Sequence, residues 1–376
     1  MPRPPEQAER TDRVSTLELF FDLVFVFTIT QLTAVLGGDP TLRGLLRVVL
    51  MLGVIFWMYG GYAWLTNAVA PDRVARRLVL LGSMAGFLVL ALTIPQAFAG
   101  GDLAFGLAYL VVVSIHAGLY SRTSVTHTVR ALVRLAPFNL VSALLVLGAV
   151  VAGGTAGYLL WAAAFACEWI TPLVTGIGGF RIAPAHFVER HGLLVIVALG
   201  ESVVAIGIGA AGQPVGLALV LVAVLGLLLA ACLWWAYFGG DDSRAERALA
   251  AVPEDHRAAV AVRAFGYWHL PILLGIIVLA AGLKHAIGHA FDRLDVAHAL
   301  LLAGGVAAFL AGDILFRRTL RIGPARHRAA AAVLALATVP AGVAASAVLQ
   351  LTALGIVLAG SLAAESPVAW ARGRRG

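Results

Sequence analysis

Charged side chains are scarce in this sequence of 376 residues, of which only 12% are Asp, Glu, Lys or Arg. A soluble domain carries about 25% charged residues. Hydrophobic residues make up 61% of the chain, and the mean hydropathy is +0.93. Such a chain cannot cover a water-facing surface, so we expect lipid to be its main solvent.

Cysteine and lysine are nearly absent. The two cysteines, Cys167 and Cys232, lie in apolar runs, which excludes a disulfide framework and a four-cysteine metal site. Lys284 is the only lysine, so the other 26 of the 27 basic residues are arginines. They occupy short segments between apolar runs, which indicates membrane topology rather than a nucleic-acid-binding face. No nucleic-acid partner is expected.

Motifs of soluble enzymes and cofactor sites are also missing. The sequence has no phosphate-binding glycine loop, no His-Glu-x-x-His and no Cys-x-x-Cys. His285 and His289 are four residues apart, a spacing that lets two imidazoles share a metal ion. Two histidines alone do not define a site, so no metal, no cofactor and no enzymatic activity are predicted.

Long apolar runs dominate what is present. Runs of this length with few charges predict transmembrane helices. The predicted fold is an all-α, polytopic transmembrane bundle of about twelve helices, the last two of which are blurred by Pro340 and a short link near Ser346. The runs cover residues 17–36, 45–67, 77–99, 103–121, 131–152, 156–177, 188–209, 215–238, 260–283, 296–316, 327–346 and 348–369.

The basic residues predict the orientation. With the N-terminus inside, the inner segments carry 23 of the 27 basic residues, and the outer ones carry only Arg43, Arg47, Lys284 and Arg293. Positive charge collects on the cytoplasmic side of membrane proteins. Residues 1–13 also lack the layout of a cleaved signal peptide. We therefore expect a multi-pass protein of the cytoplasmic (inner) membrane with both termini cytoplasmic.

The two halves of the chain align as a parallel repeat. A shift of 170 residues places Gln31 on Glu201 and Trp64 on Trp234, each Trp in an aromatic cluster at the end of a second helix. The predicted domains are a cytoplasmic segment (1–16), two six-helix repeats (17–180 and 181–370) and a cytoplasmic tail (371–376). Transporter folds with such repeats bind their substrates at the repeat interface. Loose alignment of any two apolar halves would look similar.

Glu201 is the most informative polar residue. It lies ten residues after His191, which places it roughly 15 Å along a helix and near the middle of the hydrocarbon layer. A charged group there costs about 2.5–3.5 kcal/mol on insertion scales. We expect Glu201, with the adjacent Ser202, to bind a proton or cation, and Gln31 to be its counterpart. A protonated, purely structural Glu201 is the alternative.

Other polar groups are predicted inside the membrane. Asp22 is a candidate ion-binding residue, or the partner of Arg13 or Arg190 in an ion pair. Glu168 is as deep as Glu201, and the two could share one proton. His269 is a candidate solute-binding residue, although helix–helix hydrogen bonding is the commoner role of such a histidine. The charged residues at the helix starts predict a cytoplasmic mouth: Glu18, Glu189, Arg190 and His191.

Two motifs resemble the bacterial low temperature requirement protein A (LtrA) family. They are Glu18-Leu-Phe-Phe-Asp-Leu-Val-Phe-Val-Phe27, followed by Thr30-Gln31, and Glu189-Arg-His-Gly-Leu-Leu-Val-Ile-Val-Ala-Leu-Gly-Glu-Ser202. The end of the second helix, with Trp64 and Asn67, also matches the family pattern. The resemblance covers most of the chain. It implies a multi-pass bacterial membrane protein, and the family name points to growth in the cold without implying a mechanism.

These observations favour a transporter or channel-like protein that moves a small ion or solute. The alternatives are an intramembrane or lipid-handling enzyme that uses Glu201, Glu168 and His269, and a non-catalytic membrane protein that supports growth in the cold. The expected partners are membrane lipid and the unidentified ion or solute. A homo-oligomer is compatible with the sequence.

Overall fold

The structure, a computed structural model, describes residues 14–68, 73–121 and 126–373. Every regular element in these ranges is helical, and no strand occurs among them, which confirms the predicted all-α class. Helices form in lipid because they satisfy all backbone N–H and C=O groups within one segment. Eleven described helices are long and apolar enough to cross a membrane, and Ala104–Leu119 is apolar but shorter. Each predicted run coincides with one of these twelve.

The chain forms two compact units. Unit 1 comprises residues 1–35, 46–194 and 246–267, and unit 2 comprises residues 36–45, 195–245 and 268–376. The predicted domain boundary falls between residues 180 and 181, whereas the boundary between the units falls inside one helix, after Leu194. The internal repeat itself stays a prediction.

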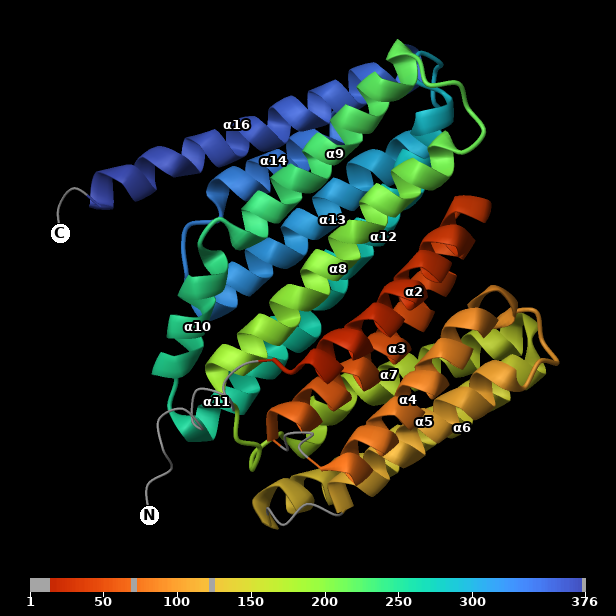
Figure 1. Cartoon of the computed structure of the whole chain (residues 1–376), viewed down its shortest axis with the longest axis vertical. Coiled ribbons are helices and arrows are strands. Elements are labelled where there is room, and N and C mark those ends of the chain that lie inside the picture. Colours follow the sequence, from red (N-terminus) through yellow and green to blue (C-terminus); the bar gives the residue numbers. More distant parts are fainter. Residues whose placement is uncertain (1–13, 69–72, 122–125, 374–376) are drawn as a thin grey trace. The chain divides into compact units, whose positions relative to one another are not determined.

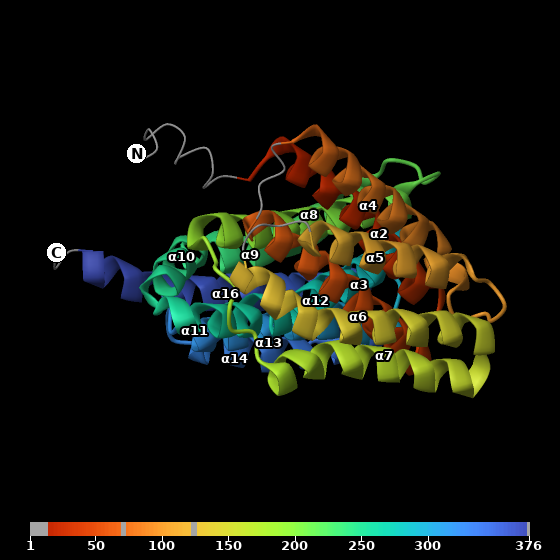
Figure 2. The same ribbon diagram turned by 90° about the horizontal axis from the view of Figure 1, so that it is seen from below.

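Helices α4, α5, α6 and α7 of unit 1 pack in succession, each against the next (Figure 1, Figure 2). Phe21 of α2 packs against Tyr62 of α3 and Phe87 of α4, with ring centroids 5.4 and 5.2 Å away. These contacts tie the first helix to the rest of unit 1. The elements wholly or largely in this unit are α2 (Thr16–Gly38), α3 (Leu42–Ala68), α4 (Val74–Thr93), η1 (Ile94–Gln96), α5 (Ala104–Ser121), α6 (Thr126–Ala152), α7 (Gly154–Thr175), α11 (Glu254–Ala261) and the π-helical η2 (Val262–Tyr267).

Unit 2 is centred on α12, which runs side by side with α13 and is buried along most of its length (Figure 1). A helix that is apolar all round is expected in such a central position. Helix α9 lies along α16 in the same unit. The elements of unit 2 are α9 (Leu217–Phe238), α12 (His269–Gly288), α13 (Val296–Leu320), α14 (Arg326–Leu336), α15 (Val339–Ala344) and α16 (Ala347–Gly373).

Four helices contain residues of both units: α2 and α3 only by a few residues at one end, and α8 and α10 over longer stretches. Helix α8 (Pro184–Ala210) begins in unit 1 and continues into unit 2, and α10 (Asp241–Ala251) begins in unit 2. Pro184 stands at the first position of α8, where the missing N–H of proline has no helical partner to lose. Helix α8 thus carries Arg190 in one unit and Glu201 in the other.

Glycines let α12 and α13 approach closely. A Cβ atom on Gly275 would lie 2.4 Å from the backbone nitrogen of Phe309, and one on Gly305 would lie 2.4 Å from that of Leu279. Only glycine fits such contacts, and small residues of this kind are typical of helix pairs in membranes. The pair is therefore held tightly along its length.

The uncertain boundary that the sequence predicted between the last two spans has a structural cause. Helix α14 ends at Leu336, and α15 starts afresh with Pro340 among its first residues. Proline cannot donate a backbone hydrogen bond, and it disfavours helical geometry in the residue before it. After Ala344, a short link through Ser346 leads into α16.

Candidate functional site

A cluster of ionisable side chains is buried in unit 1. Glu18 and Asp22 lie one turn apart on α2, and His186 and Arg190 lie one turn apart on α8. Residues four apart share one face of a helix, so each helix presents two groups to the other. The side chains of Glu18, Asp22 and Arg190 are at most 2% exposed. The fifth member is Tyr59 of α3, which is fully buried.

Arg190 bridges the two carboxylates. Its Nη2 lies 3.0 Å from Oδ1 of Asp22, and its Nη1 lies 3.3 Å from Oε1 of Glu18. The Tyr59 hydroxyl donates a hydrogen bond of 2.5 Å to the same Asp22 oxygen. The guanidinium carbon is 5.7 Å from the ring centroids of Phe21 and Tyr59. These rings also attract the cation through their π faces.

Asn67 fixes the protonation pattern of His186. Its Nδ2 donates to the carbonyl of Ala183, and its Oδ1 accepts from the N–H of Ala183, at 3.2 and 3.1 Å. The amide is thereby oriented so that Nδ2 donates to Nδ1 of His186, 3.1 Å away. An Nδ1 that accepts carries no proton, so the network assigns the neutral tautomer with its proton on Nε2. Nε2 then faces Glu18 Oε1 at 3.2 Å.

The charges of this cluster do not balance. With a neutral His186, the ionised Glu18 and Asp22 face the single positive charge of Arg190. Asp22 Oδ2 is buried, and no hydrogen bond reaches it from the residues that the structure describes. A buried, unpaired negative charge costs several kcal/mol. With both carboxylates ionised, one negative charge of the cluster therefore has no positive partner among the side chains described here.

Glu18 also has a structural role at the start of α2. Its Oε2 accepts hydrogen bonds from the backbone N–H and the hydroxyl of Ser15, both at 2.8 Å, and its own N–H faces the Ser15 hydroxyl. This reciprocal arrangement is a capping box. Asp22 has no such role, which makes it the better candidate for binding.

A pocket opens beside this cluster in unit 1. It encloses about 80 Å³, and its walls are mainly aromatic and aliphatic. That volume suffices for several water molecules. His191 and Met58 in its wall directly follow and precede the cluster residues Arg190 and Tyr59. The polar groups in the wall are His116, Asn139 and His191, and its largest apolar residues include Trp57, Trp64 and Phe265.

The predicted cytoplasmic mouth divides by burial. Glu189 is exposed, whereas Glu18, Arg190 and His191 are buried. Nδ1 of His191 lies 2.8 Å from the carbonyl of Phe187, so its ring is anchored to its own helix. Of the two predicted partners of Asp22, Arg190 is the one observed, and Arg13 lies outside the described residues.

Glu201 and Ser202 are buried in the unit 2 part of α8, at 1% and 0% exposure. The Ser202 hydroxyl has no hydrogen-bond partner among the described residues. Gln31 is half-buried on α2 in unit 1. The predicted pairing of Gln31 with Glu201 through a repeat remains a prediction.

Glu168 and His269 each have local partners. Tyr109 and Ser142 both donate to Oε1 of Glu168 in unit 1, Ser142 at 2.7 Å. Nε2 of His269 lies 2.8 Å from the Tyr237 hydroxyl in unit 2, so this histidine links α12 to α9. The proton shared between Glu168 and Glu201 remains a prediction.

The aromatic residues assigned to the repeat differ from one another. Trp64 packs edge-on against Phe180 and Phe187, with centroids 5.2 and 5.4 Å away, and lines the pocket. Trp234 is 43% exposed and stacks on Phe238. Asn67 is not aromatic, and its amide forms hydrogen bonds to Ala183 and His186 at the start of α8.

A second ion network lies in unit 2 and was not predicted from the sequence. Arg328 contacts Asp313, and its Nη1 is 3.1 Å from Asp241. Arg317 lies 3.3 Å from Asp241, and both arginines reach Glu365 at 3.1 Å. Arg244 also contacts Asp241. Three acids meet three arginines here, so this network is balanced and clamps α10, α13, α14 and α16.

Comparisons with known proteins agree with the architecture. Residues 13–363 match the family described as bacterial low temperature requirement A protein (LtrA). The chain is 29% identical over 340 residues to "Uncharacterized protein RA0937" of Rhizobium meliloti (strain 1021), covering 85% of this chain and 81% of the relative. No solved structure matches. The family match spans most of the sequence, including both α2 and α8 with their paired charges, and the chain therefore belongs to the bacterial low temperature requirement A (LtrA) family.

Proposed function

We propose that this protein moves a small ion or solute across the membrane, and that the cluster of Glu18, Asp22 and Arg190 binds the proton or cation involved. The observation that carries the proposal is the charge imbalance. Two buried carboxylates share one guanidinium, and the histidine beside them is held neutral by Asn67. Intramembrane ionisable residues commonly mark ion pathways and proton relays.

Comparison with the balanced ion network of unit 2 supports a functional role for this cluster. A network that only holds helices together is most stable when its charges cancel, as those around Arg328 do. The cluster around Arg190 keeps one carboxylate in excess at nearly zero exposure. The unfavourable energy of that charge is offset whenever a cation or proton binds.

The pocket supplies a place for a small solute. Its wall offers two imidazoles, from His116 and His191, and one amide, from Asn139, in otherwise apolar surroundings. Ligand sites in proteins typically combine apolar walls with a few polar groups of this kind. Ion binding at the cluster and solute binding in the pocket would be coupled through α3 and α8, which carry residues of both.

Glu201 is a second candidate site on the same helix. Its burial at 1% exposure supports a role in proton or cation binding, with Ser202 beside it and Gln31 as its counterpart. The arginine distribution supports a cytoplasmic-membrane protein with both termini inside. The alternative is an enzyme that uses Glu201, Glu168 and His269, which would require these residues to act on one substrate.

Flux through the purified protein tests the proposal. Liposomes with native protein should move H⁺, Na⁺ or K⁺, or an organic solute driven by one of them, faster than empty liposomes. The substitution Glu201→Gln keeps the size of the side chain but removes its ionisable proton, so ion-coupled flux should be lost in this variant. Absence of any ion-dependent flux through native protein would refute the proposal.

A further inference from the structure

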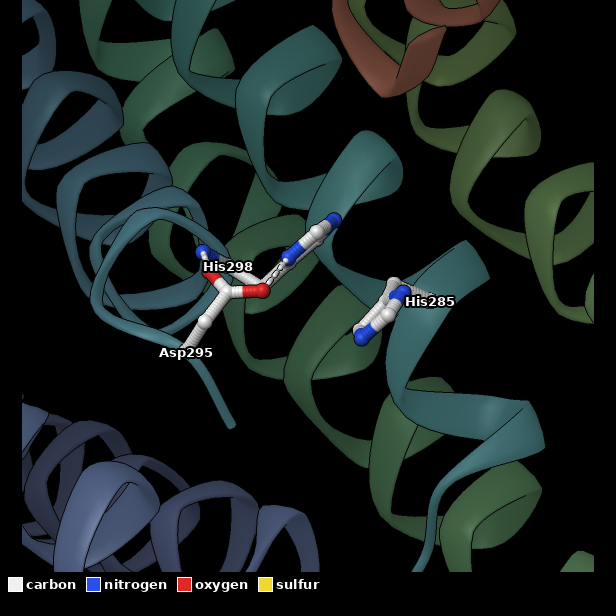
Figure 3. Close-up of side chains that lie close together, drawn as sticks. All are labelled: His285, Asp295 and His298. Carbon is white, nitrogen blue, oxygen red and sulfur yellow. Dashed lines mark hydrogen bonds and ion pairs between the residues drawn. The ribbon is translucent and has the colours of Figure 1, made fainter. Parts of the chain in front are cut away.

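The end of α12 and the start of α13 bring two histidines and one carboxylate together. His285 lies in the last turn of α12, Asp295 is the residue before α13, and His298 lies in its first turn. Each residue offers one ligand atom, and these atoms all lie within 4.8 Å of one another. Figure 3 shows the ring of His298 between the carboxylate of Asp295 on one side and the ring of His285 on the other.

Asp295 holds His298 in a defined orientation. Its Oδ1 accepts the backbone N–H of His298 at 2.9 Å, which caps α13, and its Oδ2 lies 2.6 Å from Nδ1 of the ring (Figure 3). A metal ion that replaces the proton between Nδ1 and Oδ2 would be ligated by both atoms, one from the ring and one from the carboxylate.

The position of His285 is not explained by helix capping. Its ring stacks on that of His298, with centroids 3.6 Å apart and planes inclined by 16°. His289, one turn later, stacks on the other side at 4.4 Å. No hydrogen bond to either ring nitrogen of His285 occurs in the described part of the chain, so both nitrogens remain open to a ligand.

The scaffold beneath these residues is rigid. Gly282 lies one turn before the cluster, and a Cβ atom there would lie 3.0 Å from the backbone nitrogen of Leu302. The two helix ends that carry the three residues are thus fixed against each other, as a preorganised site requires. Zn–N and Zn–O bonds measure about 2.0–2.2 Å. Separations up to 4.8 Å therefore close with modest side-chain rotation.

We propose that His285, His298 and Asp295 form a binding site for a divalent transition metal ion of the zinc class. Two imidazoles and a carboxylate suit Zn²⁺, Ni²⁺ and Cu²⁺, whereas Mg²⁺ and Ca²⁺ prefer oxygen ligands alone.

Titration of full-length, untagged protein in detergent tests the site. Addition of Co²⁺, a coloured substitute for Zn²⁺, should give visible absorption that saturates at one ion per chain, and Zn²⁺ should displace it. The substitutions His285→Gln and His298→Gln should each lower the affinity by about 10-fold or more, and Asp295→Asn should lower it while keeping the helix cap.

A matched control is available in His256. It is an exposed histidine with a carboxylate, Asp255, at 3.5 Å, and it belongs to no group of three potential metal ligands among the described residues. His256→Gln should leave Co²⁺ binding unchanged. Size-exclusion profiles identify variants that fail to fold. Absence of saturable binding to native protein, or equal affinity in folded Asp295→Asn and native protein, would overturn the proposal.

Discussion

Arg190 lies 3.0 Å from Asp22 and 3.3 Å from Glu18, so one guanidinium serves two buried carboxylates. Because His186 is in its neutral tautomer, it adds no positive charge to the cluster. This excess negative charge is the basis of the proposed ion binding. Asp22, with one oxygen that accepts no hydrogen bond from the described residues, is the group proposed to hold the proton or cation.

Arg190→Met should destabilise the protein strongly. Removal of the guanidinium leaves two buried carboxylates without compensation, which costs about 3–5 kcal/mol in comparable cases. Unfolding in mixed detergent micelles measures the change. Adding Asp22→Asn to this variant should restore part of the lost stability, and a double variant no more stable than Arg190→Met would contradict the charge count.

Glu201→Gln should abolish ion-coupled flux while the protein still folds. Glutamine keeps the size and hydrogen-bonding capacity of the side chain but cannot release a proton. Flux in liposomes and elution in size exclusion measure the two properties. Unchanged flux would remove Glu201 from the pathway and leave the cluster of unit 1 as the remaining carboxylate site.

Arg328→Met should destabilise unit 2 without a specific effect on transport. Arg328 contacts Asp313, Asp241 and Glu365, so its loss breaks a balanced buried network at a cost of about 3–5 kcal/mol. The exposed neighbour Arg326 provides a control, and Arg326→Met should leave the thermal midpoint close to native. Similar thermal midpoints for both variants would contradict a stabilising role for the ion network around Arg328.

Gly305→Ala and Gly304→Ala should differ sharply although they are adjacent. A Cβ atom at Gly305 would meet the backbone of α12 at 2.4 Å, whereas Gly304 has nothing within 4 Å. Overpacking of this kind typically costs about 1–3 kcal/mol, and alanine at an open helical position is neutral or favourable. Thermal unfolding separates the two, and equal midpoints would mean that α12 and α13 do not pack so closely.

The helices were predictable because their signal is local. Each span is one continuous apolar run, and the positions of Pro340 and Ser346 already showed where the last boundary would blur. Glu18 and Asp22 were likewise identified from the sequence as candidate polar residues of the first helix. Arg190 was one of two arginines considered as a partner of Asp22, because both sit at the start of a helix.

The contacts between distant segments were not predictable. His186 and Asn67 are 119 residues apart, and only packing shows that an amide fixes the imidazole. Arg328 and Asp313 belong to successive helices, but their link to Asp241 depends on how four helices meet. His285 was singled out for its spacing from His289, whereas the structure places it against His298 and Asp295. A clue existed in Asp295 and His298, whose spacing is that of a helix cap.

The measurement that most directly tests the account compares ion-driven flux through Asp22→Asn and Glu189→Gln in liposomes. Each change removes one carboxylate. Asp22 is buried in the cluster, whereas Glu189, which precedes Arg190 in the sequence, is exposed. The account predicts that Asp22→Asn abolishes flux and that Glu189→Gln retains it within about twofold. Native flux in folded Asp22→Asn would contradict the claim that this carboxylate binds the moving proton or cation.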